Sequence, residues 1–122
     1  MVEYKIRITR QARDHLREIR RYIEVELLAP LAAKNTIEAI KVEMQSLVHI
    51  PSRIHLTPEQ PWHDQGVRRD RVKNYYIYFW IDEENKRVEI IGVIYVTLTI
   101  NILHVDIPQK KFYNDITSNY WK

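Results

Sequence analysis

The sequence predicts an α+β fold in which a helical hairpin packs on an antiparallel sheet. An alternating apolar segment begins the chain, two amphipathic segments follow it almost without a linker, and three strand-like segments come after a proline-rich loop. Strands that are segregated from helices in this β-αα-βββ order favour a single sheet with the helices on one face. A chain of 122 residues has room for one such domain, because a second would lack enough residues for its own core.

The helical hairpin is preceded by a short strand. Over residues 2–8, apolar side chains alternate with charged ones, which is the period of a strand with one buried face. Thr9 can cap the helix that follows, in which apolar residues recur at helical spacing as far as Leu28. Pro30 suits the first turn of a second helix, and Pro51 stops it. We therefore expect helices over residues 10–28 and 30–50.

Three further strands are expected in the second half of the chain. The loop over residues 51–66 is rich in proline, and strand-like segments follow it at residues 67–72, 75–81 and 87–95. Short turn-like segments separate them, which predicts an antiparallel meander. Residues 96–122 do not alternate cleanly, so we divide the chain into a domain over residues 1–95 and a C-terminal extension that we expect to pack on it.

Composition excludes several classes of function. The chain has no cysteine, which removes disulfides, thiolate nucleophiles and cysteine metal sites and fits the reducing cytoplasm. Its two glycines cannot form a phosphate-binding loop, so we expect no nucleotide cofactor. The five histidines lack the spacing of metal ligands, and no apolar run approaches the roughly 20 residues that cross a bilayer. We therefore expect no metal and no membrane partner.

The densest functional signal is a basic segment that leads into an aromatic one. In an extended strand Arg69, Arg71 and Lys73 share one face at intervals of about 7 Å, near the phosphate spacing of a nucleic-acid strand. Aromatic residues between Tyr75 and Trp80 could stack on unpaired bases. The segment is equally compatible with an edge strand whose charges prevent aggregation and whose aromatic residues fill the core.

Two weaker signals accompany this segment. The first helix carries five arginines that acidic residues balance only in part, which suits a solvated face or a binding surface; they are Arg10, Arg13, Arg17, Arg20 and Arg21. His63 lies shortly before the basic segment and could act as a general acid or base, although an exposed loop histidine has the same pattern. No serine lies in a nucleophile elbow, and no acidic pair suggests glycosidase chemistry.

Several segments, taken in order, resemble the RelE/ParE superfamily, the toxins of bacterial type II toxin–antitoxin and plasmid-stabilisation systems. The resemblance spans roughly residues 3–95 and rests on Tyr4–Thr9, Ala12–Ile19, Gly66–Arg69, Val72–Tyr75, Tyr78–Glu83 and Val93–Tyr95. It implies the RelE/ParE-like β-αα-βββ fold, a cytoplasmic toxin without a cofactor, and a cognate antitoxin that wraps the sheet and the hairpin.

The resemblance leaves two modes of toxicity open. RelE-like members are mRNA interferases, which cut mRNA in the ribosomal A site without a metal, and this is the function that we expect first. It implies that Arg69, Arg71 and Lys73 hold phosphate while Tyr95 or His63 transfers protons. The nucleic-acid-binding residues are then Arg68, Arg69, Arg71, Lys73 and Tyr75.

Two departures from the ribonuclease pattern support the alternatives. Tyr76 stands where ribonuclease members often carry an arginine, and Tyr95 is followed by Val96–Thr99 rather than by an arginine-containing segment. ParE-like members instead poison DNA gyrase and have no catalytic set. The alternatives are therefore a gyrase inhibitor, or a degenerate protein that binds antitoxin but is not toxic.

Overall fold

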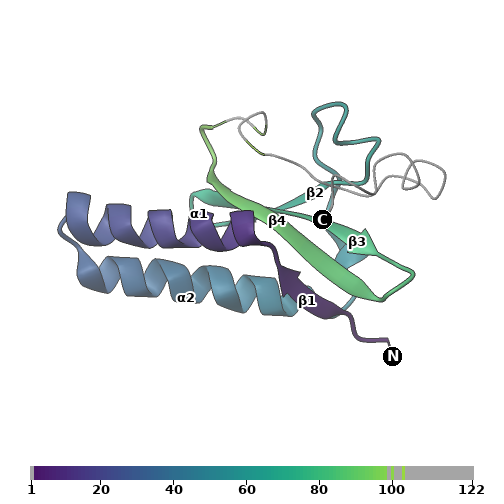
Figure 1. Ribbon diagram of the computed structural model, residues 1–122, viewed down its shortest axis with the longest axis horizontal. Coiled ribbons are helices and arrows are strands. Elements are labelled where there is room, and N and C mark those ends of the chain that lie inside the picture. The colour runs from purple at the N-terminus through teal and green to yellow at the C-terminus, as the bar shows by residue number, and fades with distance from the viewer. Residues whose placement is uncertain (1, 99, 101–102, 104–122) are drawn as a thin grey trace.

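The computed structural model describes residues 2–98, 100 and 103. Its elements are β1 (Lys5–Ile8), α1 (Arg10–Arg21), the π-helical η1 (Tyr22–Glu26), α2 (Pro30–Ser46), the 3₁₀ helix η2 (Pro51–Arg53), β2 (Arg68–Val72), β3 (Tyr75–Asp82) and β4 (Arg87–Tyr95). The β-αα-βββ order confirms the predicted fold class. Figure 1 shows the two helices side by side on one face of the sheet.

The sheet has the order β1-β4-β3-β2. Strands β2, β3 and β4 form the predicted antiparallel meander. β1 joins β4 in parallel, with Lys5 opposite Arg87 and Ile8 opposite Ile90. The sheet is therefore mixed rather than purely antiparallel, because the chain leaves β1 through the helical hairpin and only the last strand returns beside it in the same direction.

The helices differ in detail from their predicted bounds. Only residues 10–21 of the first are α-helical, after which the chain continues as η1 and turns at Leu28 with a φ of 52°. α2 ends at Ser46 instead of continuing to Pro51. Their apolar faces pack on the sheet as the spacing predicted, in a cluster that contains Ala12, Leu16, Ile37, Ile40, Met44, Leu47, Ile77, Phe79, Val88, Ile90 and Val93. We call this side of the sheet the helix face.

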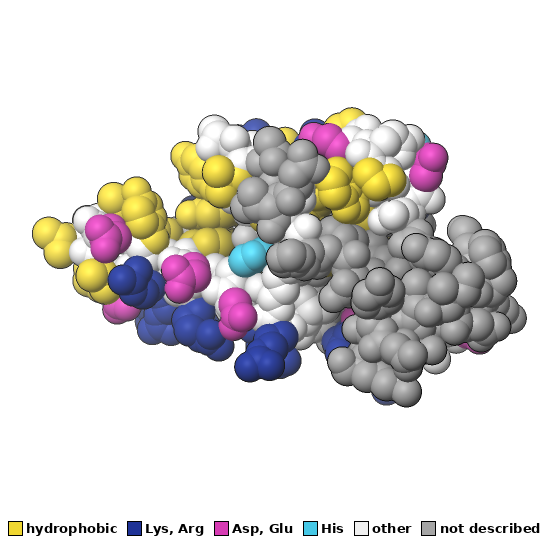
Figure 2. Space-filling view, turned by 45° about the horizontal axis from the view of Figure 1, so that its top comes forward, with side chains coloured by type: hydrophobic (Ala, Val, Ile, Leu, Met, Phe, Trp, Pro, Cys, Tyr) yellow, Lys and Arg dark blue, Asp and Glu magenta, His cyan; other side chains and the backbone are white. Residues whose placement is uncertain are grey.

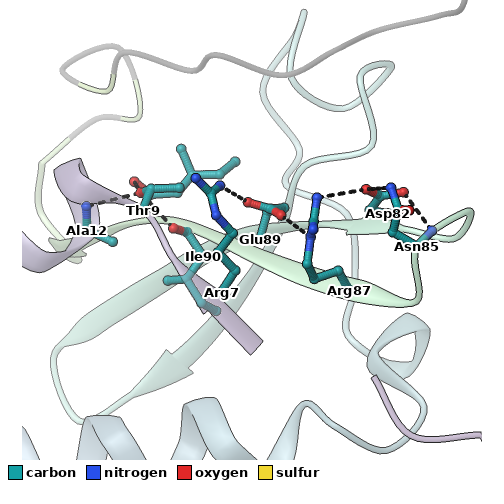
Figure 3. Close-up of polar contacts among 9 residues, drawn as sticks. Arg7, Thr9, Ala12, Asp82, Asn85, Arg87, Glu89 and Ile90 are labelled. Atoms are coloured by element: carbon teal, nitrogen blue, oxygen red, sulfur yellow. Dashed lines mark hydrogen bonds and ion pairs between the residues drawn. The ribbon is translucent and has the colours of Figure 1, made fainter. Parts of the chain in front are cut away.

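Polar contacts hold β1 and the start of α1 on β4 (Figure 3). Glu89, only 4% exposed, lies between two arginines, with Oε1 2.6 Å from Arg7 Nη1 and Oε2 2.7 Å from Arg87 Nε. The Thr9 hydroxyl donates to the Ile90 carbonyl at 2.8 Å and accepts from the Ala12 amide at 3.2 Å. The helix cap and the strand pairing are thus one connected network.

The opposite side of the sheet, which we call the loop face, carries a second apolar cluster. Val67, Tyr78, Ile91, Ile94, Ile100 and Leu103 are buried in it, and Trp62, Tyr76 and Trp80 pack against it. The later part of the loop before β2, which contains Trp62, lies on this side (Figure 1), whereas Ile54 near its start packs on the helix face. A register shift at Tyr78/Phe79 inserts an extra residue in β4, so Ile90 and Val93, three residues apart, share the helix face while Ile91 and Ile94 share the loop face. Both faces of the sheet are therefore covered by the chain itself.

One buried carboxyl on the helix face has no ion-pair partner among the described residues. Asp70 of β2 is 9% exposed, and its Oδ2 has no hydrogen-bond partner. Burial, together with a hydrogen bond and charge repulsion from Glu43 of α2, raises the pKa of Asp70 to about 7, against a smaller opposing effect of Arg53. Folding therefore favours the protonated form of Asp70.

This protonation predicts that Asp70→Asn stabilises the protein at alkaline pH. Between pH 3.8, the unfolded value, and about 7, the folded state binds the extra proton, so stability falls as pH rises. Asp70→Asn removes the buried charge and should raise the free energy of unfolding by about 2 kcal/mol near pH 8 and by less than about 1 kcal/mol near pH 5, where only part of the loss has occurred. Thermal melts at both pH values measure the difference. Equal effects at both values would contradict the assignment.

Candidate functional site

A groove of about 790 Å³ opens where the helical hairpin extends past the end of the sheet. One wall comes from α1, η1 and α2, and the other from the β2–β3 turn and the end of β4; the lining includes His15, Ile19, Tyr22, Ile23, Leu27, Lys73, Tyr75, Val93, Tyr95 and Leu98. Figure 2 shows hydrophobic side chains gathered at the tip of the hairpin and on the end of the sheet. The groove is therefore mainly apolar.

The tip of the hairpin is unusually apolar for an exposed turn. Tyr22, Val25 and Leu27 are each slightly more than half exposed, while Leu31 is 69% and Leu28 83% exposed. Contiguous exposed apolar side chains of this kind mark interaction surfaces. The resemblance placed an antitoxin on the hairpin without naming these residues, and the three leucines on either side of Pro30 were the sequence signal that could have located the surface.

The floor of the groove depends on contacts between α1 and β4. β1 pairs with β4 only as far as Ile90, and beyond that point α1 flanks the strand. The Val93 amide donates to His15 Nδ1 at 3.1 Å, and Gln11 Nε2 donates to the Ile91 carbonyl at 3.0 Å. Burial lowers the pKa of His15, which keeps the imidazole neutral and Nδ1 available as an acceptor.

Gly92 allows this close approach. A side-chain carbon at this position would clash with Leu103 and would lie 3.0 Å from two atoms of the His15 ring. The missing side chain therefore leaves space that Leu103 and the His15 ring of α1 occupy. Its place in the middle of a strand is explained by packing rather than by a turn.

The structure divides the predicted site residues between the two faces of the sheet. Arg69 and Arg71 lie opposite Tyr78 and Tyr76 and so belong to the loop face. Tyr75 packs on the helix face, and its ring meets that of Tyr95 edge-on, with centroids 5.5 Å apart. The two-residue turn that pairs Val72 with Tyr75 sets this alternation. The two-residue turn was the sequence signal for this register, and it could have shown that Arg71 and Tyr75 take opposite faces of the sheet.

Lys73 departs from the predicted row, and Arg68, expected to bind nucleic acid, is engaged within the protein. Lys73 lies in the turn after β2 with a φ of 53°, and it lines the groove beside Tyr75 rather than continuing the face of Arg71. The prediction that it shares their face is wrong because β2 ends at Val72. Arg68 pairs opposite Phe79 and donates to the carbonyls of Ser52 and Ile54.

Arg69 is largely committed to contacts within the protein. Its guanidinium lies 4.3 Å from the centre of the Tyr76 ring and 3.7 Å from Glu59 Oε1. Glu59 in turn accepts a hydrogen bond from the buried Thr57 at 2.8 Å. With 27% of its side chain exposed, Arg69 connects the loop before β2 to the loop face. Arg71 is exposed, and its Nε donates to the Lys73 carbonyl.

His63 belongs to that same loop. Its Nδ1 lies 3.5 Å from Asp64 Oδ1, and the neighbouring Trp62 packs on the loop face. The structure therefore groups Lys73, Tyr75 and Tyr95 at the groove, and places His63, Arg69 and Arg71 on the other side of the sheet. Among the described residues, no group of three or more histidine, aspartate and glutamate side chains could hold a metal ion.

The comparisons agree with this architecture. Residues 6–96 match the family described as the ParE toxin of the type II toxin–antitoxin system parDE. The chain belongs to the ParE toxin family. A search of curated proteins found no match. None of the described helices is long and apolar enough to cross a bilayer.

Solved structures show the same fold. The chromosomal ParDE system from P. aeruginosa gives a TM-score of 0.64 at 21% identity, covering 77% of this chain and 97% of that one. The toxin–antitoxin complex RelBE2 from Mycobacterium tuberculosis gives 0.56 at 22% identity, with 78% and 93% covered. A double mutant of E. coli RelE in the free state gives 0.55 at 14% identity, with 77% and 84% covered. This chain is thus a toxin of a type II system.

The Gly92 packing predicts a specific non-additivity. Gly92→Ala should destabilise the protein by about 1–3 kcal/mol, because the new methyl group displaces Leu103 and His15. In a Leu103→Ala background one of the two clashes is gone, so the same substitution should cost at least about 0.5 kcal/mol less. Urea unfolding of the four proteins in this cycle measures the coupling. Additive effects would show that Leu103 does not pack over Gly92.

Proposed function

We propose that this toxin inhibits DNA gyrase through protein contacts and does not cut mRNA. One observation carries the proposal: the residues expected to cut RNA are divided between the two faces of a covered sheet, so that no face holds all the predicted phosphate-binding and proton-transfer groups. Arg69 and Arg71 are on the loop face, whereas Tyr95 is on the helix face at the groove. The family also contains the gyrase-directed ParE branch, to which the matching family description refers.

The chemistry of RNA cleavage explains why this separation matters. Attack by a ribose 2′-OH needs a base, an acid and a cationic group within hydrogen-bond reach of one phosphate, about 3 Å. A sheet and its two layers of packed side chains lie between Arg69 and Tyr95. His63 is on the same side as Arg69, but Arg69 is already engaged by Tyr76 and Glu59. This arrangement does not favour catalysis.

The groove has instead the character of a protein-binding site. Aromatic anchors with a polar rim typify such sites, and Tyr22, Tyr75 and Tyr95 line the groove beside Lys73 and Glu18. We propose that the cognate antitoxin fills the groove and covers the hairpin tip, and that gyrase contacts the same surface when the antitoxin is absent. Both partners place the toxin in the cytoplasm.

Induced expression in a bacterial host separates the two modes of toxicity. The proposal predicts growth arrest with altered plasmid supercoiling on a topology gel, and no new breaks in a reporter mRNA by primer extension. Arrest with mRNA breaks at codon spacing and unchanged supercoiling would contradict it. Soluble, folded protein that causes no arrest would indicate the non-toxic alternative.

A charge placed in the groove should weaken both partner interactions. Leu27 lines the groove and is 55% exposed, so Leu27→Asp should leave the protein folded. We expect at least about a tenfold loss of antitoxin affinity by calorimetry, since the carboxylate must be desolvated in an apolar site, and a parallel loss of growth arrest. Val42→Asp is the matched control, because Val42 is 68% exposed on α2 outside the groove lining. Equal effects of the two variants would refute the groove assignment.

The exposed arginine of the loop face supplies the complementary test. Arg71→Gln removes a cation that the ribonuclease alternative requires but that lies away from the groove. The proposal predicts unchanged growth arrest, measured as colony counts after induction. If a folded Arg71→Gln protein no longer arrested growth, the proposal would be contradicted, because the loop face would then contribute to toxicity.

A further inference from the structure

The exposed side of α1 carries a charged surface that the proposed function does not use. Its five arginines are all exposed; they are Arg10, Arg13, Arg17, Arg20 and Arg21, and we call them the arginine stripe. At about 100° per residue they fall within an arc of about 100° on the helix. Figure 2 shows a row of Lys and Arg side chains along one edge of the molecule.

The acidic side chains of α1 lie along one flank of this stripe. On the same helical projection Asp14 and Glu18 lie on the flank that turns towards the groove, and Glu18 lines the groove. Asp14 pairs with Arg17 at 2.9 Å, a contact in which both side chains stay more than half exposed. Within the described part of the chain, no ion pair involves the other four arginines. Four cations are therefore available to a partner.

The buried face of α1 shows that these charges do not serve a membrane. Ala12 and Leu16 are committed to the core, whereas an interfacial helix must insert its apolar face among lipids. α1 also contains no aromatic residue from Arg10 to Arg21. Stacking on unpaired bases, which single-strand recognition needs, has no support on this face.

We propose that the arginine stripe binds the phosphate backbone of duplex DNA without sequence preference. Guanidinium groups pair with phosphates in a two-pronged geometry, and the stripe extends about 16 Å, enough for two or three phosphates of one strand. It lies on the opposite side of α1 from the groove-lining His15. The choice of duplex DNA rests on the proposed function, because gyrase acts while it is bound to a DNA duplex. The stripe faces away from the groove, so it stays accessible to that duplex when gyrase occupies the groove.

Fluorescence anisotropy with the full-length toxin and a duplex of about 20 base pairs tests the stripe directly. Between 50 and 200 mM salt the logarithm of the association constant should fall against the logarithm of the salt concentration with a slope of about −2 to −3, as two or three phosphate contacts require. Arg10→Gln/Arg13→Gln/Arg20→Gln should reduce this slope to about −1 and weaken binding at least about tenfold. These positions are exposed, and glutamine preserves helix propensity.

A matched control removes the same number of charges elsewhere. Lys34→Gln/Lys41→Gln/Lys86→Gln lies outside α1, at exposed positions, and should change the affinity less than about twofold. Equal weakening by the two triple variants would mean that only net charge matters and would overturn the assignment. Tighter binding to a single strand of the same length would also overturn it. So would a stripe variant that binds duplex DNA normally but loses antitoxin affinity.

The DNA-binding inference and the gyrase proposal can fail independently of each other. DNA binding is measured without gyrase, so absence of binding by the wild-type protein overturns this inference and leaves the gyrase proposal standing. Conversely, normal DNA binding by a toxin that leaves supercoiling unchanged in cells contradicts the gyrase proposal alone.

Discussion

The short parallel pairing between β1 and β4 determines much of the rest of the structure. β1 has four residues and reaches only Ile90, and the buried Glu89 holds it there between two arginines. Thr9 then starts α1 directly beside the strand that β1 has stopped covering. The remaining edge of β4 is therefore flanked by a helix, through His15 and Gln11, instead of by another strand.

This arrangement explains why the groove exists and why it is apolar. The helical hairpin follows the uncovered part of β4 and continues past its end, so its tip extends beyond the sheet and its leucines stay exposed among the described residues. A strand at the same edge would have offered hydrogen bonds to a partner strand. The helix offers an apolar wall instead, which suits a partner that buries side chains rather than pairs backbones.

The sequence predicted the elements better than it predicted their relation in space. The turn-like segments and the strand-like residues between them located β2, β3 and β4 almost to the residue. The parallel orientation of β1 relative to β4 depends on pairing between distant segments, which no local sequence pattern specifies. Ile100 and Leu103 were expected only as part of the C-terminal extension. Their burial on the loop face could not be predicted from the sequence, because Leu103 packs into the space that Gly92 leaves. The remaining extension beyond residue 103 lies outside the described residues.

The predicted site residues are divided between the two faces for a more specific reason. Arg69, Arg71 and Tyr95 are each of the right chemical type, and a single strand would have aligned some of them. The two-residue turn and the pairing of Arg69 with Tyr78 instead fix which face each one takes. The sequence therefore shows which residue types are present, but the face that each residue takes depends on the register of the hairpin.

Hydrogen–deuterium exchange of the toxin, alone and bound to gyrase, tests most directly the claim that toxicity resides on the groove side of the sheet. The account predicts slower exchange on binding at the end of α1, in η1 and around Lys73 and Tyr95, with no change in the loop before β2. Protection confined to that loop and to β2 would contradict it, because the working surface would then be the loop face.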